Sequence, residues 1–263
     1  KISIAQLNLT ADSMLTDPTA AAEIGLIDGL AYYDQIQDLL KAASNADKFS
    51  AINFISVSKY AKQLDLNGNS DYSDERIAVI IAQGEIRGGE GSEYIIGSDR
   101  IAAAIRKARM NDKVKAIVLR VNSPGGSALA SEVIQHELRL AGEKMPVIVS
   151  MGTVAASGGY WISAYADRIY AEPNTITGSI GVIGMFLNFK EIANNHGFTF
   201  DVVKTGKFAD ALSVTRPKSA EEMAIVQREV DDVYSDFLRK VAEGRNQPAE
   251  HIAKIAEGRV WSG

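Results

Sequence analysis

A hydroxyl nucleophile is the chemistry that one serine of this sequence could supply. Ser157 lies within the small-residue run Ala155–Gly159, after an apolar, β-branched stretch at Val147–Met151 and before a breaker-free stretch at Tyr160–Ala166. The first stretch is typical of a buried strand and the second favours a helix. Ser157 is therefore expected at a strand-to-helix turn, where unpaired backbone N–H groups suit a forming oxyanion. A serine in this place can also simply cap a helix.

A second glycine-rich turn could supply hydrogen-bond donors. The sequence NSPGG at Asn122–Gly126 follows a strand-like run at Ala116–Arg120 and precedes a helical pattern at Ala128–Ala141. Two glycines behind a proline form a rigid turn whose amides can point outward together, as in an anion-binding nest. Pro-Gly-Gly alone is ordinary loop sequence. Two such turns, one offering a hydroxyl and the other offering donors, favour nucleophilic catalysis.

Three motifs in this order carry a family resemblance. NSPGG at Asn122–Gly126, ASGGYW at Ala156–Trp161 and TGSIGV at Thr177–Val182 resemble the signal peptide peptidase A family, also called protease IV. The match runs from about Arg76 to Gly263, and the chain is more distantly similar to the Clp protease proteolytic subunit and the crotonase superfamily. The resemblance implies an α/β fold of stacked ββα units with outer helices, the Clp protease/crotonase-like fold.

The same resemblance implies roles for individual residues. Ser157 would be the nucleophile of a Ser-Lys dyad in a serine endopeptidase that degrades cleaved signal peptides at the membrane. The amides of Gly126 and Gly158 would form the oxyanion hole, with Gly125 the weaker candidate. Ser179 would orient the lysine base.

The general base is where this sequence departs from the family pattern. The histidine position of Clp-type enzymes falls within Ser179–Phe186, which contains no histidine, and His136, His196 and His251 are expected to be surface residues. Counted from Gly206, the family's lysine position falls on Ala209. In the long, duplicated members an upstream module supplies the lysine, so the base is expected from a module absent from this chain. Lys207 is the alternative, although two residues of extended chain displace it by ~7 Å.

Apolar residues around the motifs are candidates for the substrate pocket. They are Val154, Ile180 and Val182, with Ile183 and Met185 beside them. Such a pocket would accept small or apolar side chains with broad specificity, although these residues could equally belong to the core. Two other functions stay open: a crotonase-like acyl-CoA enzyme, and a catalytically silent scaffold half in which Ser157 is structural.

Composition limits the other functions and partners. The chain has 263 residues, 46% of them hydrophobic, which is ample for a sizeable core, and a net charge of −5 that argues against a nucleic-acid partner. Cysteine is absent, so disulfides and thiol catalysis are excluded. No metal or organic cofactor is implied. No apolar run reaches the ~18 residues of a membrane span, so a membrane anchor is expected outside this chain.

The family resemblance also predicts location, assembly and modules. It implies a peptidase that faces the periplasm at a bacterial inner membrane and self-associates, a tetramer being expected, with peptide substrates. The phrase at Ala22–Asp28 resembles the closing signature of a module, and Gly258–Gly263 resembles the phrase just before such a signature. We therefore expect residues 1–45 to be the tail of a preceding module, residues 46–75 to be a linker with a short strand at 49–57, and residues 76–263 to be the serine-bearing module, truncated at its end.

Strands and helices are expected to alternate after Arg76. The pattern predicts strands at Ile77–Ala82 and Lys115–Val121 and helices at Gly97–Met110 and Lys218–Ala242. Strands that are apolar throughout indicate a mostly parallel sheet with helices outside. Between Ile81 and Ser98 a glycine-rich loop is expected. It has no GxGxxG placed between a strand and a helix, so a dinucleotide site is not expected.

Overall fold

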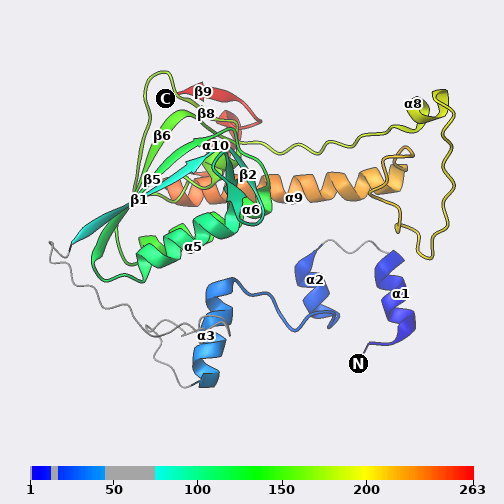
Figure 1. The fold of residues 1–263 in the computed structure, drawn as a ribbon, viewed down its shortest axis with the longest axis horizontal. Coiled ribbons are helices and arrows are strands. Elements are labelled where there is room, and N and C mark those ends of the chain that lie inside the picture. The colour runs from blue at the N-terminus through cyan, green and yellow to red at the C-terminus, as the bar shows by residue number, and fades with distance from the viewer. Residues whose placement is uncertain (1, 13–16, 45–74) are drawn as a thin grey trace, which may run out of the picture. The chain divides into compact units, whose positions relative to one another are not determined.

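The structure is a computed structural model that describes residues 2–12, 17–44 and 75–263. It divides into two compact units. The larger contains Tyr32–Gly181 and Phe237–Gly263, and the smaller contains residues 1–31 and Val182–Asp236. Figure 1 shows a sheet flanked by helices in the larger unit. The module boundaries expected at 45/46 and 75/76 stay predictions, and the expected strand at 49–57 lies outside the described residues.

The larger unit is built on a mostly parallel sheet, which confirms the predicted α/β class. The strand order is β1-β5-β6-β8-β9, with β7 also paired to β6; all pairs are parallel except β8 with β9. The strands are β1 (Arg76–Gln83), β5 (Val114–Ser123), β6 (Val147–Ala156), β7 (Arg168–Tyr170), β8 (Ile176–Gly178) and β9 (Val260–Ser262). Because parallel strands end at the same edge of a sheet, the turns after β5, β6 and β8 are brought together.

The glycine-rich segment after β1 is more ordered than the expected loop. It forms a three-stranded sheet of β2 (Glu85–Arg87), β3 (Gly91–Ser92) and β4 (Ile95–Gly97), in the order β2-β4-β3. Ile86 and Ile96 are fully buried in the core of the larger unit. The expectation of a loop was wrong because these two apolar side chains outweigh the turn-forming effect of the surrounding glycines.

Helices cover one face of the large sheet. They are α5 (Ser98–Arg109) and α6 (Ala128–Gly142), and their apolar residues pack with the inward-facing strand residues in one core. Between the two helices Glu137, whose side chain is only 2% exposed, binds both Arg106 and Arg109. On edge strand β1 the alternate residues Ile77, Val79 and Ile81 are exposed instead.

The helices α3, α7 and α10 also belong to the larger unit. α3 (Tyr33–Ser44) contacts α5 and α6: Asp34 pairs with His136 at 2.7 Å, and the Arg106 guanidinium lies over the Tyr33 ring. α7 (Gly158–Trp161) follows β6, and α10 (Ala249–Ile255) precedes β9. The helix expected through Ala166 was wrong in length, because α7 ends after one turn at Trp161.

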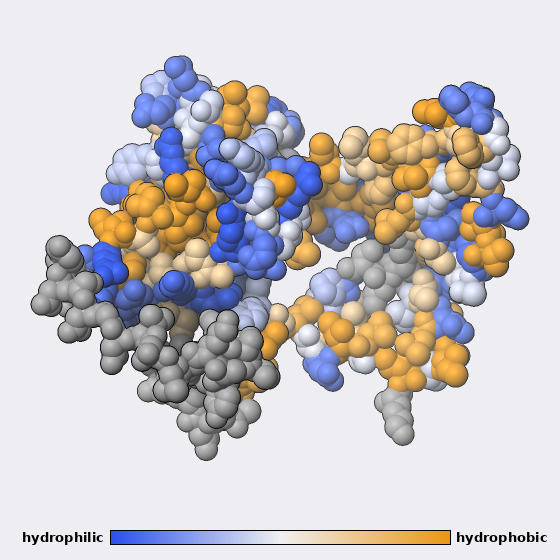
Figure 2. All heavy atoms as spheres, in the orientation of Figure 1, coloured by the Kyte–Doolittle hydropathy of each residue, from blue (hydrophilic) through white to orange (hydrophobic). Residues whose placement is uncertain are grey.

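The smaller unit has little regular structure apart from helices. It contains α1 (Ile4–Asp12), α2 (Pro18–Glu23), α8 (Lys190–Asn195) and the first part of α9 (Ala220–Arg245), which continues into the larger unit. Arg216 binds both Asp210 and Glu222 there. Apolar side chains lie at the surface of both units (Figure 2). Among the described residues, no helix is both long and apolar enough to cross a bilayer.

Candidate active site

Ser157 lies at the predicted strand-to-helix turn. Strand β6 ends at Ala156, and Ser157 is the N-cap residue of α7, with φ 52° and ψ −119°. This left-handed backbone conformation costs a non-glycine residue about 1–3 kcal/mol and persists only where the surroundings hold it. The Ser157 side chain is partly exposed and has no hydrogen-bond partner among the described residues. A strained turn with an available hydroxyl is a suitable setting for a nucleophile.

The NSPGG turn packs directly against Ser157. A Cβ placed on Gly125 would lie 2.8 Å from the Ser157 Cβ and 2.7 Å from the Gly158 nitrogen. A Cβ on Gly158 would lie 3.3 Å from the Gly126 nitrogen. The glycines are therefore needed for this close approach, because any side chain would push the two turns apart.

Two of the backbone amides beside Ser157 are available. Within the described part of the chain, neither the Gly126 N–H nor the Gly158 N–H donates a hydrogen bond. The Gly125 N–H, in contrast, donates to the Ser123 hydroxyl at 3.1 Å. A pair of unused donors beside a hydroxyl is what a tetrahedral oxyanion requires.

Ser179 directly follows the neighbouring strand β8, as Ser157 directly follows β6. The register of β6 and β8 pairs Ala156 with Gly178, and the Ser157 N–H donates to the Gly178 carbonyl at 2.9 Å. Ser179 also has a left-handed backbone, with φ 48°. Both serines thus leave the sheet together at its carboxyl edge.

No candidate base is bonded to Ser157 in the part of the chain that the structure describes. His136 pairs with Asp34, His196 donates from its Nδ1 to the Ile192 carbonyl, and His251 is exposed. The expectation of a surface position is wrong for His136, whose side chain is only 17% exposed because α3 covers it.

The two positions expected to matter for the lysine lie in the smaller unit. Lys207 binds Glu221 at 2.6 Å, and its side chain is 53% exposed. It therefore lacks the burial that would favour a neutral, basic amine. Ala209 lies three residues after Gly206, in a turn where its N–H donates to the Gly206 carbonyl.

The predicted pocket residues divide between the two units. Val154 and Ile180 belong to the larger unit, where Val154 is partly buried and Ile180 is 4% exposed. Val182 is the first residue of the second segment of the smaller unit. Ile183 and Met185 are 95% and 79% exposed, so neither is a core residue.

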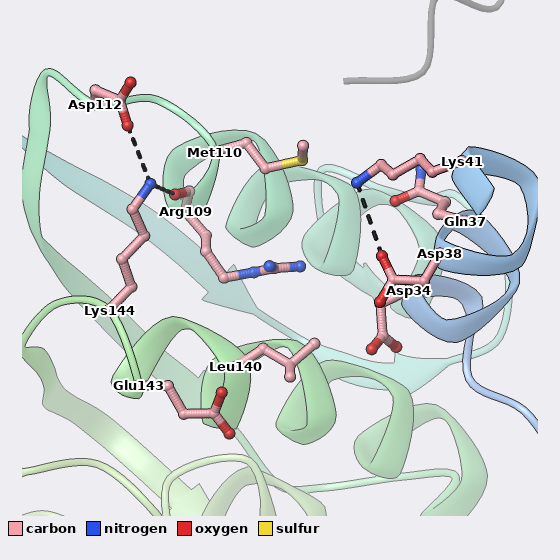
Figure 3. A pocket seen from close by; sticks show the side chains of 10 residues that line it. All are labelled: Asp34, Gln37, Asp38, Lys41, Arg109, Met110, Asp112, Leu140, Glu143 and Lys144. Atoms are coloured by element: carbon pink, nitrogen blue, oxygen red, sulfur yellow. Dashed lines mark hydrogen bonds and ion pairs between the residues drawn. The ribbon is translucent and has the colours of Figure 1, made fainter. Parts of the chain in front are cut away.

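A separate pocket lies among α3 and the C-terminal ends of α5 and α6. Its volume is about 680 Å³, and Figure 3 shows charged side chains around it from α3, from the end of α5 and from the segment that follows α6. It is lined by Asp34, Gln37, Asp38, Lys41, Arg109, Met110, Asp112, Leu140, Glu143 and Lys144. Because the active-site turns lie at the N-terminal end of α6, this pocket belongs to a different site.

Ser123, the serine of NSPGG, is a residue of the site to which the sequence alone assigned no role. Its side chain is fully buried and accepts the Gly125 N–H. A Cβ on Gly159 would lie 2.8 Å from its carbonyl oxygen. Ser123 thus contacts both turns: it bonds Gly125 in its own turn and lies close to Gly159 in the turn of Ser157. In the sequence, its position inside the NSPGG motif is the feature that could have indicated a role.

Known proteins resemble this chain over most of its length. Residues 139–263 match the family described as Peptidase family S49. Protease 4 of Salmonella typhi is 42% identical over 241 residues, which cover 90% of this chain and 38% of that protein. Protease 4 of Haemophilus influenzae is 40% identical over a region that covers 92% of this chain and 40% of that protein. The chloroplastic serine protease SPPA of Arabidopsis thaliana is 35% identical over a region that covers 92% of this chain and 36% of that protein.

The chain therefore spans about two fifths of the length of these relatives. Among solved structures, a ClpP1 mutant from Listeria monocytogenes aligns with a TM-score of 0.44 and 17% identity, over 69% of this chain and 80% of that one.

Proposed function

Because the chain belongs to peptidase family S49, we propose that it is the nucleophile-bearing part of a serine peptidase. The observation that carries this proposal is the geometry at Ser157. Among the described residues, its hydroxyl and the backbone N–H groups of Gly126 and Gly158 have no hydrogen-bond partner, and they lie on two turns that touch. This arrangement supports acyl transfer through a negatively charged tetrahedral intermediate.

The reaction follows from these groups. The Ser157 Oγ attacks the carbonyl carbon of the scissile peptide bond while a base takes its proton. The carbonyl oxygen becomes an oxyanion that accepts hydrogen bonds from Gly126 and Gly158. Collapse of the intermediate expels the amine, which receives the proton from the base, and leaves an acyl-enzyme ester. A water molecule, deprotonated by the same base, then hydrolyses the ester and restores Ser157.

We infer that the base is a lysine from an upstream module, so that the dyad is completed by a part outside this chain. Ala209 at the family's lysine position supports this proposal, as does the exposed ion pair of Lys207 with Glu221. Ser179 would orient the lysine, because it leaves the sheet beside Ser157. Gly125 is a weaker oxyanion donor because its N–H is already bonded to Ser123.

Substrate and setting are proposed from the relatives. The substrates would be peptides, specifically cleaved signal peptides, bound with small or apolar side chains against Val154, Ile180 and Val182. The protein would act at a bacterial inner membrane, facing the periplasm, as a homo-oligomer of four chains. The membrane anchor would lie outside this chain.

The test is labelling of the full-length protein with a fluorophosphonate, followed by intact mass measurement. One adduct is expected in the wild type and in Ser92→Ala, which changes an exposed serine of β3, and none in Ser157→Ala. A wild type that forms no adduct, or a Ser157→Ala protein that still forms one, contradicts the proposal and favours the scaffold half. Lys207→Ala should retain activity. Saturable acyl-CoA binding to an unlabelled protein would favour the crotonase-like enzyme.

A further inference from the structure

Trp161, the last residue of α7, is held at each of its polar groups. Its backbone N–H donates to the carbonyl of Ser157 at 2.9 Å. Its carbonyl accepts a hydrogen bond from the Gln135 side chain at 2.8 Å, and its indole N–H donates to Glu132 at 3.1 Å. The ring packs against Phe237, with 4.6 Å between the ring centroids. Trp161 is thus fixed to α6 and α9 and is bonded directly to the nucleophile residue.

The Gln135 amide is oriented so that its nitrogen donates to Trp161, and this orientation leaves its oxygen unsatisfied among the described residues. The side chain is buried, and its Oε1 has no hydrogen-bond partner among the described residues. Turning the amide over would place that oxygen against the Trp161 carbonyl, so the carbonyl fixes the orientation. An unsatisfied buried acceptor is unfavourable and rare in native proteins. A requirement for the donor at this place explains why glutamine stands at position 135 instead of an apolar residue.

Glu132 is the centre of a second polar cluster, which is partly buried. It accepts hydrogen bonds from the Trp161 indole, from Lys240 of α9 at 3.0 Å and from the Tyr32 hydroxyl. Burial raises the pKa of Glu132, but these hydrogen bonds and the Lys240 charge outweigh burial and lower that pKa. The carboxylate is therefore charged at neutral pH and holds the indole through a strong, charge-assisted bond.

We propose that Glu132 and Gln135 are positioning residues, which hold Trp161 and through it the turn that carries the nucleophile. This inference rests on the proposed function of Ser157. A left-handed serine stays in place only where its surroundings over-determine the backbone, and one turn of helix is too short to do so alone. The two α6 side chains supply that constraint through their hydrogen bonds to Trp161.

The sharpest variant is Gln135→Leu in the full-length protein. It removes the donor to Trp161 together with the unsatisfied oxygen, so stability should not fall. The Trp161 carbonyl keeps the Ala164 N–H as a partner. We expect kcat and the rate constant of fluorophosphonate labelling to fall about tenfold with KM within twofold, because displacements below 1 Å already slow such reactions.

Trp161→Phe and Glu132→Gln test the second contact. Trp161→Phe removes the indole N–H and part of the ring but keeps an aromatic side chain beside Phe237, and it should lower kcat about tenfold. If Glu132 acts through this N–H, the protein that carries both Trp161→Phe and Glu132→Gln should have a kcat no lower than that of the slower single variant. The matched control is Tyr165→Phe. It also removes a hydrogen bond from an aromatic side chain to a glutamate, here from Tyr165 to Glu243, but this bond does not involve α7. It should keep wild-type kcat.

The outcomes separate the two proposals. A wild type that does not label at Ser157 overturns the proposed function. If the wild type labels at Ser157 and the Gln135→Leu and Trp161→Phe proteins label at the same rate, only the positioning role is overturned. Multiplied effects in the double variant likewise overturn the route through the indole. If Glu132→Gln does not fold because the charged Lys240 loses the Glu132 carboxylate, the other two variants decide the question.

Discussion

Replacing Gly125 with alanine should separate the two turns of the active site. The new Cβ would lie 2.7 Å from the Gly158 nitrogen and 2.8 Å from the Ser157 Cβ, whereas ordinary van der Waals contact begins at 3.4 Å. Because the first of these is a backbone atom, rotating a side chain cannot relieve the clash. The turns must move apart by about 0.7 Å, and a displacement near 1 Å can cost about 10²-fold in rate. We expect kcat/KM of Gly125→Ala to fall by roughly that factor.

A matched glycine separates this clash from backbone strain. Gly89 also has a positive φ, of 81° against 103° at Gly125, but a Cβ there meets no atom within 4 Å. Gly89→Ala should therefore lose about 1 kcal/mol of stability from strain and keep its activity. The assay is kcat/KM for a peptide substrate in the full-length protein, with a thermal melt of each variant. A folded Gly125→Ala protein within threefold of wild-type activity would refute the close approach of the turns.

Two further predictions concern ion pairs away from the site. Glu137→Gln leaves two partly buried arginines without a carboxylate and should lower the free energy of unfolding by about 3 kcal/mol; a urea titration that shows less than about 1 kcal/mol contradicts it. In the smaller unit the hydrogen bond from Arg216 lowers the pKa of Glu222 to about 2 from an ordinary 4.5. The native carboxylate thus binds fewer protons than the unfolded one, so its stabilisation is complete above pH 4.5 and is lost as the pH falls towards 2. Amide hydrogen exchange around residue 219 should show this loss of stability. Because Asp210 also binds Arg216, Glu222→Gln should weaken the pH dependence of exchange without abolishing it; an unchanged pH dependence would exclude Glu222 as a contributor.

The sequence predicted those parts of the fold that depend on local pattern. The apolar runs of β1, β5 and β6 and the periodicity of α5, α6 and α9 gave elements whose ends differ from the structure by a few residues. Strand β6 is longer than expected because its small residues Gly152 and Ala155 can still pair in a sheet. The prediction of a loop between Ile81 and Ser98 was wrong because burial of Ile86 depends on its pairing with Gly126, which is distant in the sequence.

The grouping of segments could not be predicted from local pattern. The smaller unit joins residues 1–31 to residues 182–236, as in the hydrogen bond from the Lys207 N–H to Asp12 at 3.2 Å. Such contacts connect positions that are far apart in the sequence and leave no periodic signal.

The candidate site was predictable to a similar degree. The motifs gave the residue types and the order of the turns, and the parallel sheet explains why the turns meet. The register that places Ser179 beside Ser157, and the contacts of Ser123 and Trp161, arise from packing between elements. The pattern of a single sequence does not contain them.

The left-handed backbone of Ser157 sets folding against activity at this one position. Glycine adopts such a conformation without steric cost, so a Ser157→Gly protein should unfold at a higher urea concentration than Ser157→Ala. The most stable residue at this position is therefore one that carries no nucleophile. The serine of this strained turn thus keeps the proposed nucleophile in place at a cost in stability that glycine would avoid.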